Sequence, residues 1–282
     1  SGRRSTINNR LVQQGVITKG EDVFSQTASD ELLQRAKPAL QAPELQIEAA
    51  QAFKTPKPRF LNGQAMFNAV APHYDFLNRL LSAGYDRRWR KLAVNEFESV
   101  ASKTFLDVAT GTADIALEMA SRQPAPHKII GMDFSQSMLE LGNKKVSGQD
   151  IKLIPGSAEN IPLKDKIFDG VVTAFGVRNF SDAEQGLREM HRVLKPKGKI
   201  VVLEFSFPQN GLLQWFYRFY FENILPLTGR IISGHKSAYS YLPTSVTNFP
   251  QGNEFKKMLE ESGFHNVSYK RLTFGIVTLY TG

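Results

Sequence analysis

The sequence predicts an α/β fold in which helices cover both faces of a seven-stranded, mostly parallel sheet. Five short apolar stretches between residues 104 and 205 alternate with stretches whose apolar residues recur every three or four positions. Strands separated by helices of about 10 to 15 residues imply right-handed crossovers and a parallel sheet. Two more apolar stretches, 267–272 and 275–280, are joined by a tight turn and predict an antiparallel hairpin at the sheet edge.

The predicted elements follow a regular order along the chain. The strands cover residues 104–108, 127–133, 151–154, 168–175, 199–205, 267–272 and 275–280, and helices cover residues 135–146, 182–194 and 252–262. A further helix opens directly behind the turn that ends the first strand.

We predict that residues 1–60 lie outside this domain. After a weakly amphipathic segment, Pro56 and Pro58 indicate a linker. We therefore expect an N-terminal arm, partly disordered or a targeting remnant, and one catalytic domain over residues 61–282. Runs of helical spacing from 64 to 100 precede the first strand and should lie over a ligand cleft.

The strongest functional signal lies where the first predicted strand ends. Small residues follow it, and Gly111 among them can adopt a positive φ and let a ligand approach the backbone. Asp133 ends the second strand twenty-two residues later, where an acid in doubly wound folds accepts the ribose hydroxyls of a nucleoside. The alternative is that Asp133 only caps the helix that begins near Ser135.

The same turn indicates which nucleoside binds. A dinucleotide site needs three glycines for the pyrophosphate, whereas the turn from Ala109 to Ala113 has Gly111 alone and Asp107 stands in the strand before it. Carboxylates repel phosphates and suit a cationic ligand. S-adenosylmethionine, with an ammonium and a sulfonium group, is the cofactor that fits.

Composition excludes several kinds of enzyme. The chain has no cysteine, which removes disulfides, cysteine-ligated metal centres and a thiolate nucleophile. The net charge of +8 suits an anionic surface, but the basic residues are spread out in pairs such as Lys144 and Lys145. A solvated surface and a membrane-facing patch both remain open.

Further candidates lie in loops beyond the carboxyl ends of other strands, where ligands of such sheets bind. In the loop after the third strand, which contains Ser157 and Ala158, a small residue would let an adenine ring lie flat, and Ser157 or a backbone N–H would meet its edge. Met138 would pack on that ring or belong to the core. After the fourth strand, Arg178 can hold a carboxylate, stabilise a phenolate or pair with an acid. Glu204, which ends the fifth strand, can pair with Arg178 or orient a substrate hydroxyl.

A dense aromatic segment follows the fifth strand. Residues 211–232 carry six aromatic side chains between Trp215 and Phe221, and Tyr239 and Tyr241 follow. A helix that is apolar around most of its circumference must be covered by protein, lipid or an apolar substrate. We expect residues 208–250 to form a lid over a long hydrophobic ligand.

These motifs together resemble those of the ubiquinone and menaquinone biosynthesis C-methyltransferase family, from about Phe67 to Tyr280. The matching pieces are Val70–Asp75 with Asn78, Leu106–Asp114, Asp133, Ser157–Pro162, Phe175–Asn179, His191–Pro196, Leu203–Ser206 and Ser237–Leu242. The resemblance implies a class I, Rossmann-like, S-adenosylmethionine-dependent methyltransferase that methylates a ring carbon of a polyprenyl hydroquinone. It also implies contact of Thr112, Asp133, Ser157 and Ala158 with the cofactor.

The candidate residues fall into three groups. The cofactor-binding candidates are Asp107, Gly111, Thr112, Asp133, Met138, Ser157, Ala158 and Ala174. The catalytic candidates are Arg178, Tyr74 and Glu204, and the substrate-binding candidates are Asn179, Tyr239 and Tyr241. No metal site is expected.

The expected partners are a polyprenyl quinol, a membrane surface touched peripherally, and a second copy or a quinone-biosynthesis complex; nucleic acid is not expected. With these partners, the protein is expected on the inner face of a bacterial cytoplasmic membrane or on the matrix side of the mitochondrial inner membrane. Two alternatives stay open. An inactive scaffold would account for Thr110 and Ala113, where the family usually has glycine, and an RNA methyltransferase would account for the basic composition.

Overall fold

A computed structural model describes residues 68, 71, 74–76, 78–79, 82–220 and 244–282. The chain divides into two compact units, Ser1–Lys57 and Pro58–Gly282, and all described residues belong to the second. The predictions for residues 1–60 and for Tyr239 and Tyr241 lie outside the described residues.

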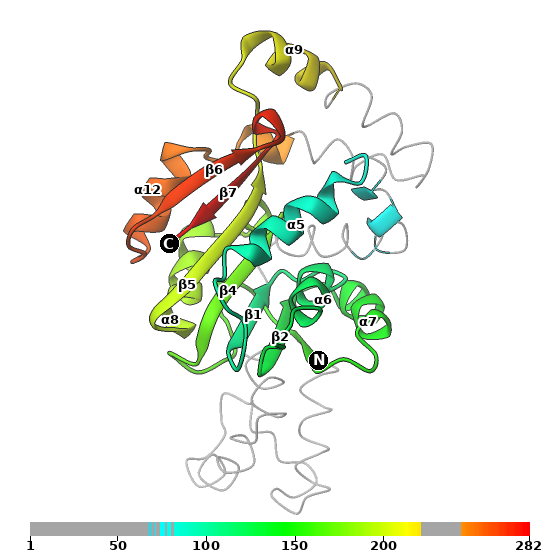
Figure 1. Cartoon of the computed structure of the whole chain (residues 1–282). Helices are drawn as coiled ribbons and strands as arrows, with labels where there is room; N and C mark the ends of the chain where they lie inside the picture. Colours follow the sequence, from blue (N-terminus) through cyan, green and yellow to red (C-terminus); the bar gives the residue numbers. More distant parts are fainter. Residues whose placement is uncertain (1–67, 69–70, 72–73, 77, 80–81, 221–243) are drawn as a thin grey trace, which may run out of the picture. The chain divides into compact units, whose positions relative to one another are not determined.

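Seven strands form one sheet in the order β3-β2-β1-β4-β5-β7-β6 (Figure 1). The strands are β1 (Thr104–Val108), β2 (Lys128–Asp133), β3 (Ile151–Pro155), β4 (Phe168–Ala174), β5 (Leu194–Phe205), β6 (Ser268–Leu272) and β7 (Val277–Thr281). The first five pair in parallel, while β7 runs antiparallel to both β5 and β6. The predicted fold class and the antiparallel hairpin at the sheet edge are confirmed.

Helices cover both faces of this sheet. The covering helices are α5 (Tyr85–Asn95), α6 (Asp114–Ala120), α7 (Gln136–Lys145), α8 (Ala183–Val193) and α12 (Asn253–Glu261). A further helix is α9 (Gly211–Phe219), and η1 (Val177–Asn179) and η3 (Thr273–Gly275) are short 3-10 turns. The connections from β1 to β2 to β3 run one way across the sheet, and that from β4 to β5 runs the other way. Right-handed crossovers therefore put α6 and α7 on the face opposite to α8. In Figure 1, α5 lies beside α6, and α12 beside α8.

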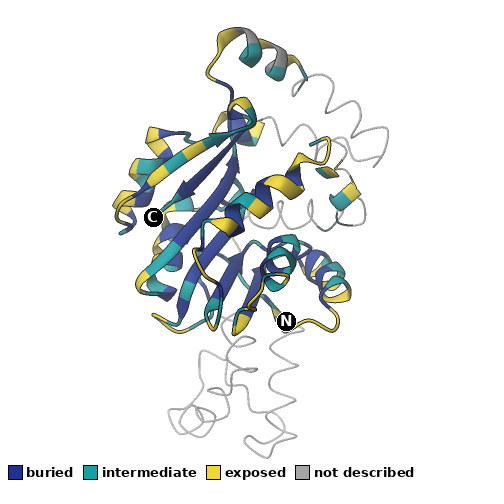
Figure 2. Ribbon diagram, viewed as in Figure 1, coloured by how far each residue is buried: buried dark blue, intermediate teal, exposed yellow. Residues whose placement is uncertain are grey.

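The core lies between these layers and is built on the central strands (Figure 2). Leu106, Val172 and Val201 on β1, β4 and β5 are fully buried, because helices cover both sides of these strands. Trp89 of α5 makes edge contacts with Phe175 and Phe205, whose rings stack 4.4 Å apart. This aromatic cluster lies at the carboxyl ends of β4 and β5.

The structure differs from the predicted elements mainly at the start of β5. The sequence predicted a strand from Lys199, whereas β5 begins at Leu194, which pairs with Phe168. The pairing then shifts and resumes where Lys199 meets Gly170. Lys197 with a φ of 65° lies in this irregular stretch, so the apolar pattern that predicts strands starts only after it.

Within the described part of the predicted aromatic helix, α9 ends at Phe219. No helix in the described ranges is long and apolar enough to cross a bilayer.

Candidate functional site

The turn after β1 is sharply bent. Ala109, Gly111 and Ala113 have φ angles of 56°, 55° and 69°, all in the left-handed region. This conformation costs residues with a Cβ roughly 1 to 2 kcal/mol, so Ala113 adopts with some strain a shape that glycine adopts freely. The turn therefore keeps its bend with alanine in place of the glycine that the resembling family usually has.

Thr110 locks this turn from inside. Its Oγ1 donates a hydrogen bond of 2.6 Å to Asp107 Oδ2. Gly131 of β2 makes the room, because a Cβ there would lie 2.8 Å from the Thr110 hydroxyl. Asp107 is buried beneath this turn, which follows the end of β1.

Asp133 joins the ends of β1 and β2. Its Oδ2 accepts a hydrogen bond of 2.8 Å from the backbone N–H of Gly111, and its Oδ1 accepts one of 2.8 Å from that of Ser135. Ser135 itself caps α7, because its hydroxyl accepts from the N–H of Met138. The helix cap is thus Ser135, and the alternative that Asp133 only caps this helix is wrong.

Neither of these two buried acids forms an ion pair within the described chain. Burial raises the pKa of Asp133 to about 6, although three backbone N–H groups act to lower it. Burial also raises the pKa of Asp107 to about 7; the hydrogen bond from Thr110 opposes this rise and the charge of Asp133 adds to it. A ligand that brings hydroxyl donors or positive charge would relieve both acids, whereas a phosphate would be repelled. These two acids therefore fit S-adenosylmethionine, which carries ribose hydroxyl donors, an ammonium group and a sulfonium group.

Arg178 and Glu204 form a buried ion pair at the ends of β4 and β5. Their side chains are 7% and 1% exposed, and Arg178 Nη1 lies 2.5 Å from Glu204 Oε1. The same Nη1 donates to the carbonyl of Phe175, and the guanidinium lies 5.2 Å from the centre of the Phe205 ring. Phe175 has a φ of 60°, which for a bulky residue is an outlier typical of functional sites.

Two buried polar atoms beside this pair have no hydrogen-bond partner in the described chain. They are Arg178 Nε, a donor, and Asn179 Oδ1, an acceptor. Buried polar atoms are nearly always paired, so the donor of Arg178 and the acceptor of Asn179 each call for a partner that the described chain does not supply. A hydroxyl or a water molecule can accept from the first and donate to the second.

Tyr74 lies between the two halves of the site. A Cβ on Gly111 would lie 3.9 Å from its ring. Burial raises the pKa of the Tyr74 hydroxyl, the hydrogen bond with Asn78 and the charge of Arg178 oppose that rise, and the charge of Asp133 adds to it. The hydroxyl is thus within electrostatic reach of both Asp133 and Arg178.

The remaining candidates are placed as follows. The Ser157 hydroxyl donates to Glu159, which leaves the backbone of the loop after β3 to meet a ligand. Ala158 is buried, and Ala174 ends β4 opposite Leu203. Met138 is buried in a small cluster with Ala71, against which Tyr74 and Leu141 pack. Among the described residues, no three His, Asp or Glu side chains gather as metal ligands would.

Sequence reasoning missed a cluster of charges around Thr112. Its hydroxyl donates to Asp75 Oδ1 over 2.6 Å and accepts from Lys145 Nζ over 3.0 Å. The sequence groups Lys145 with Lys144 among the spread-out basic pairs, but of the two only Lys144 is exposed. The signal for this cluster in the sequence was the Val70–Asp75 motif, which ends at Asp75.

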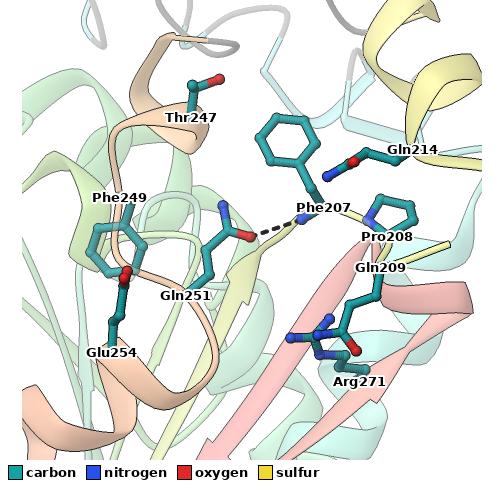
Figure 3. Close-up of a pocket in the computed structure, with 9 residues that line it drawn as sticks. All are labelled: Phe207, Pro208, Gln209, Gln214, Thr247, Phe249, Gln251, Glu254 and Arg271. Atoms are coloured by element: carbon teal, nitrogen blue, oxygen red, sulfur yellow. Dashed lines mark hydrogen bonds between the residues drawn. The ribbon is translucent and has the colours of Figure 1, made fainter. Parts of the chain in front are cut away.

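A cavity of about 490 Å³ lies elsewhere, between the end of β5, the start of α9 and the start of α12 (Figure 3). Its lining residues are Phe207, Pro208, Gln209, Gln214, Thr247, Phe249, Gln251, Glu254 and Arg271. Gln251 braces it by accepting a hydrogen bond from the backbone N–H of Phe207. None of the predicted site residues lines this cavity.

The fold is that of the class I, S-adenosylmethionine-dependent methyltransferases. A solved structure of an S-adenosylmethionine-dependent methyltransferase from Thermotoga maritima, described as a possible histamine N-methyltransferase, shares the fold. Its TM-score is 0.55 at 18% identity, over 78% of this chain and 98% of that chain.

The chain belongs to the ubiE/COQ5 methyltransferase family, whose model matches residues 58–282. It is 48% identical over 223 residues to a protein from Geotalea daltonii named ubiquinone/menaquinone biosynthesis C-methyltransferase UbiE, covering 78% of this chain and 94% of that protein. A demethylmenaquinone methyltransferase from Deinococcus radiodurans is 44% identical over 221 residues, 78% of this chain and 91% of that protein. The family resemblance found in the sequence is confirmed, and the chain is a methyltransferase.

Proposed function

We propose that this protein transfers a methyl group from S-adenosylmethionine to a ring carbon of a polyprenyl hydroquinone. The relatives named above carry ubiquinone, menaquinone or demethylmenaquinone in their names, which supports a quinol substrate. The observation that carries the proposal is the unpaired donor and acceptor of Arg178 and Asn179, a match for a ring hydroxyl, beside a turn whose acids suit a cationic cofactor.

Asp133 would hold the ribose hydroxyls of the cofactor, and Asp107 and Thr112 would lie near its cationic end. When bound, S-adenosylmethionine supplies a methyl group activated by the sulfonium charge. The protein's acids contribute by favouring that charge and by excluding phosphate-bearing competitors.

The substrate side of the reaction needs an anion. A ring carbon becomes a good nucleophile when the neighbouring hydroxyl loses its proton, and the enzyme must then stabilise the oxyanion. After the methyl group is transferred, that carbon must lose its own proton to restore the aromatic ring. Arg178 Nε is the buried donor for this anion, or for the water that takes the proton. Glu204 holds the guanidinium in place through Nη1, and Tyr74 contributes a second hydroxyl close to the same charge.

We also propose that α9 meets a membrane surface, because a polyprenyl substrate resides in lipid. Trp215 and Phe219 are 60% and 51% exposed, and their rings stack 6.1 Å apart on one face of the helix. Exposed aromatic side chains on an amphipathic helix are typical of interfacial contact with lipid. The protein would then lie peripherally on a bacterial cytoplasmic membrane or on the matrix side of the mitochondrial inner membrane.

No observation on the described residues supports the inactive scaffold or the RNA methyltransferase. The turn around Ala113 keeps its left-handed bend. Titration calorimetry with S-adenosylmethionine tests the proposal at its first step: we expect binding with a dissociation constant in about the micromolar range. Absence of binding at roughly millimolar cofactor would favour the inactive scaffold.

A further inference from the structure

Lys145 ends α7, and its ammonium group is surrounded by acceptors from three other segments. Nζ lies 2.9 Å from Asp75 Oδ2 and 3.0 Å from Thr112 Oγ1, and it also pairs with Asp114 at the start of α6. A lysine ammonium has three protons to donate, and these three acceptors use all of them. The side chain is only 26% exposed.

The packing of α7 explains how Lys145 reaches the turn. Gly142, three residues earlier and on the same helix face, is buried, and a Cβ there would lie 3.5 Å from the carbonyl oxygen of Gly111. A Cβ at Gly142 would also lie 2.7 Å from Leu153 Cδ1, so the absence of a side chain lets α7 pack closely on β3 while it touches the backbone of the turn. Lys145, which lies three residues further along α7, then reaches Thr112 within this turn.

The cluster favours the ionised form of the Asp75 carboxyl. Burial acts to raise the pKa of the Asp75 carboxyl, but the hydrogen bonds from Thr112 and Lys145 outweigh burial and hold that pKa below its usual value. Asp114 has a second cation, Arg90, 3.4 Å away. Asp75 also feels the charge of Arg79, but its hydrogen-bond donors within the described chain are Thr112 and Lys145. Because Tyr74 precedes Asp75, fixing Asp75 fixes the ring that lies over Gly111.

The cluster also sets the polarity of the Thr112 hydroxyl. A hydroxyl has one proton and two lone pairs. The Thr112 proton is donated to Asp75, and one lone pair accepts from Lys145. The remaining lone pair can only accept a hydrogen bond, which suits a ligand that arrives with a donor, such as an ammonium group.

We propose that Lys145 is a positioning residue of the cofactor site, which clamps Asp75 and Thr112 so that Tyr74 stays over the Gly111 turn and Thr112 presents an acceptor to the cofactor. This role rests on the proposed function, since it presumes that S-adenosylmethionine binds at this turn. Lys145 itself does not touch the reacting atoms.

The test compares Lys145→Met with Lys144→Met, which removes the same charge from the same last turn of α7 at an exposed position. Calorimetry with S-adenosylhomocysteine and with S-adenosylmethionine gives the affinity. Hydrogen exchange in peptides that contain Tyr74 and Thr112, measured without cofactor, reports the clamp directly. We expect Lys145→Met to weaken both ligands about tenfold or more and to speed exchange in both peptides.

Lys144→Met should behave like the unchanged protein in both measurements. Lys145→Arg keeps the charge and offers several N–H donors in a different geometry, and we expect it to weaken affinity less than Lys145→Met does. If Lys145→Met matches Lys144→Met in affinity and exchange, the inference is wrong. If the unchanged protein binds neither ligand, the proposed function fails, and unaltered exchange in Lys145→Met would then overturn the clamp separately.

Discussion

Arg178 is held firmly on one side and has an unpaired donor on the other. Glu204 and the carbonyl of Phe175 take up Nη1, whereas Nε has no partner in the described chain. We predict that Arg178→Lys lowers kcat about 100-fold or more, because lysine keeps the charge but loses the planar fork that directs Nε while Nη1 is anchored. Arg188→Lys, on the exposed face of α8, is the matched control, and full kcat in the Arg178→Lys variant would show that this geometry is not used.

Asp133 should make cofactor binding dependent on pH. Its pKa is raised to about 6 in the free protein, and ribose hydroxyls donate best to the ionised carboxylate. Affinity for S-adenosylmethionine should therefore rise as the pH increases through about 6, and rise further as Asp107 ionises at about 7. Asp133→Asn should bind about tenfold or more weakly and lose the step near 6. A calorimetric titration series unchanged by this substitution would remove Asp133 from the site.

The sequence predicted some of these residues and not others for a physical reason. Asp133 could be predicted because its place at a strand end, at a set distance from Gly111, is a pattern along the chain. Lys145 could not, since its role depends on α7 lying against the turn through Gly142, and Lys144 beside it looks the same in the sequence.

The helix α9 is the element through which we expect contact with lipid. Replacing Trp215 by Gln and Phe219 by Ser removes the stacked aromatic pair without touching the sheet. We predict weaker binding to liposomes of anionic lipid and weaker dependence of activity on prenyl length, with calorimetric cofactor affinity unchanged. Tyr85→Ser, an exposed aromatic on α5, serves as the control. Equal liposome binding by the unchanged protein, the double variant and Tyr85→Ser would contradict the proposed contact of α9 with lipid.

The β6–β7 turn is tied to α5 by one hydrogen bond. The buried Trp89 donates its Nε1–H to Thr273 Oγ1 over 2.7 Å. We predict that Thr273→Val destabilises the fold by about 1 to 3 kcal/mol, because it leaves a buried donor unpaired. Thr273→Ser keeps the hydroxyl and should cost less; if both changes give the same urea midpoint, the bond contributes nothing measurable.

The sequence predicted the strands and helices of the sheet well, but it misplaced the start of one strand. The apolar strands and the helical spacing are local patterns, so the parallel sheet and its antiparallel hairpin followed from them. The start of β5 at Leu194 depends on its pairing with Phe168, a contact between distant residues that no local pattern records.

The molecule brings the two proposed sites, one for a cationic cofactor and one for an oxyanion, to the same edge of its sheet. The first is formed by the ends of β1 and β2, and the second by the ends of β4 and β5; β4 is the neighbour of β1 on its other side, and β5 follows β4. Tyr74 lies within electrostatic reach of both. The sequence predicted that both sites lie at the carboxyl edge of a parallel sheet, whereas the strand order that makes their strand ends adjoin comes from the structure.

The most direct test follows the methyl group itself. The protein is incubated with S-adenosylmethionine carrying an isotope-labelled methyl group and with a polyprenyl hydroquinone that lacks one ring methyl, and the product is analysed by mass spectrometry and NMR. We predict that the label appears on a ring carbon, and that Arg178→Lys slows its appearance while the cofactor still binds. A label found on a ring oxygen, or no labelled quinol despite bound cofactor, would contradict the proposed reaction.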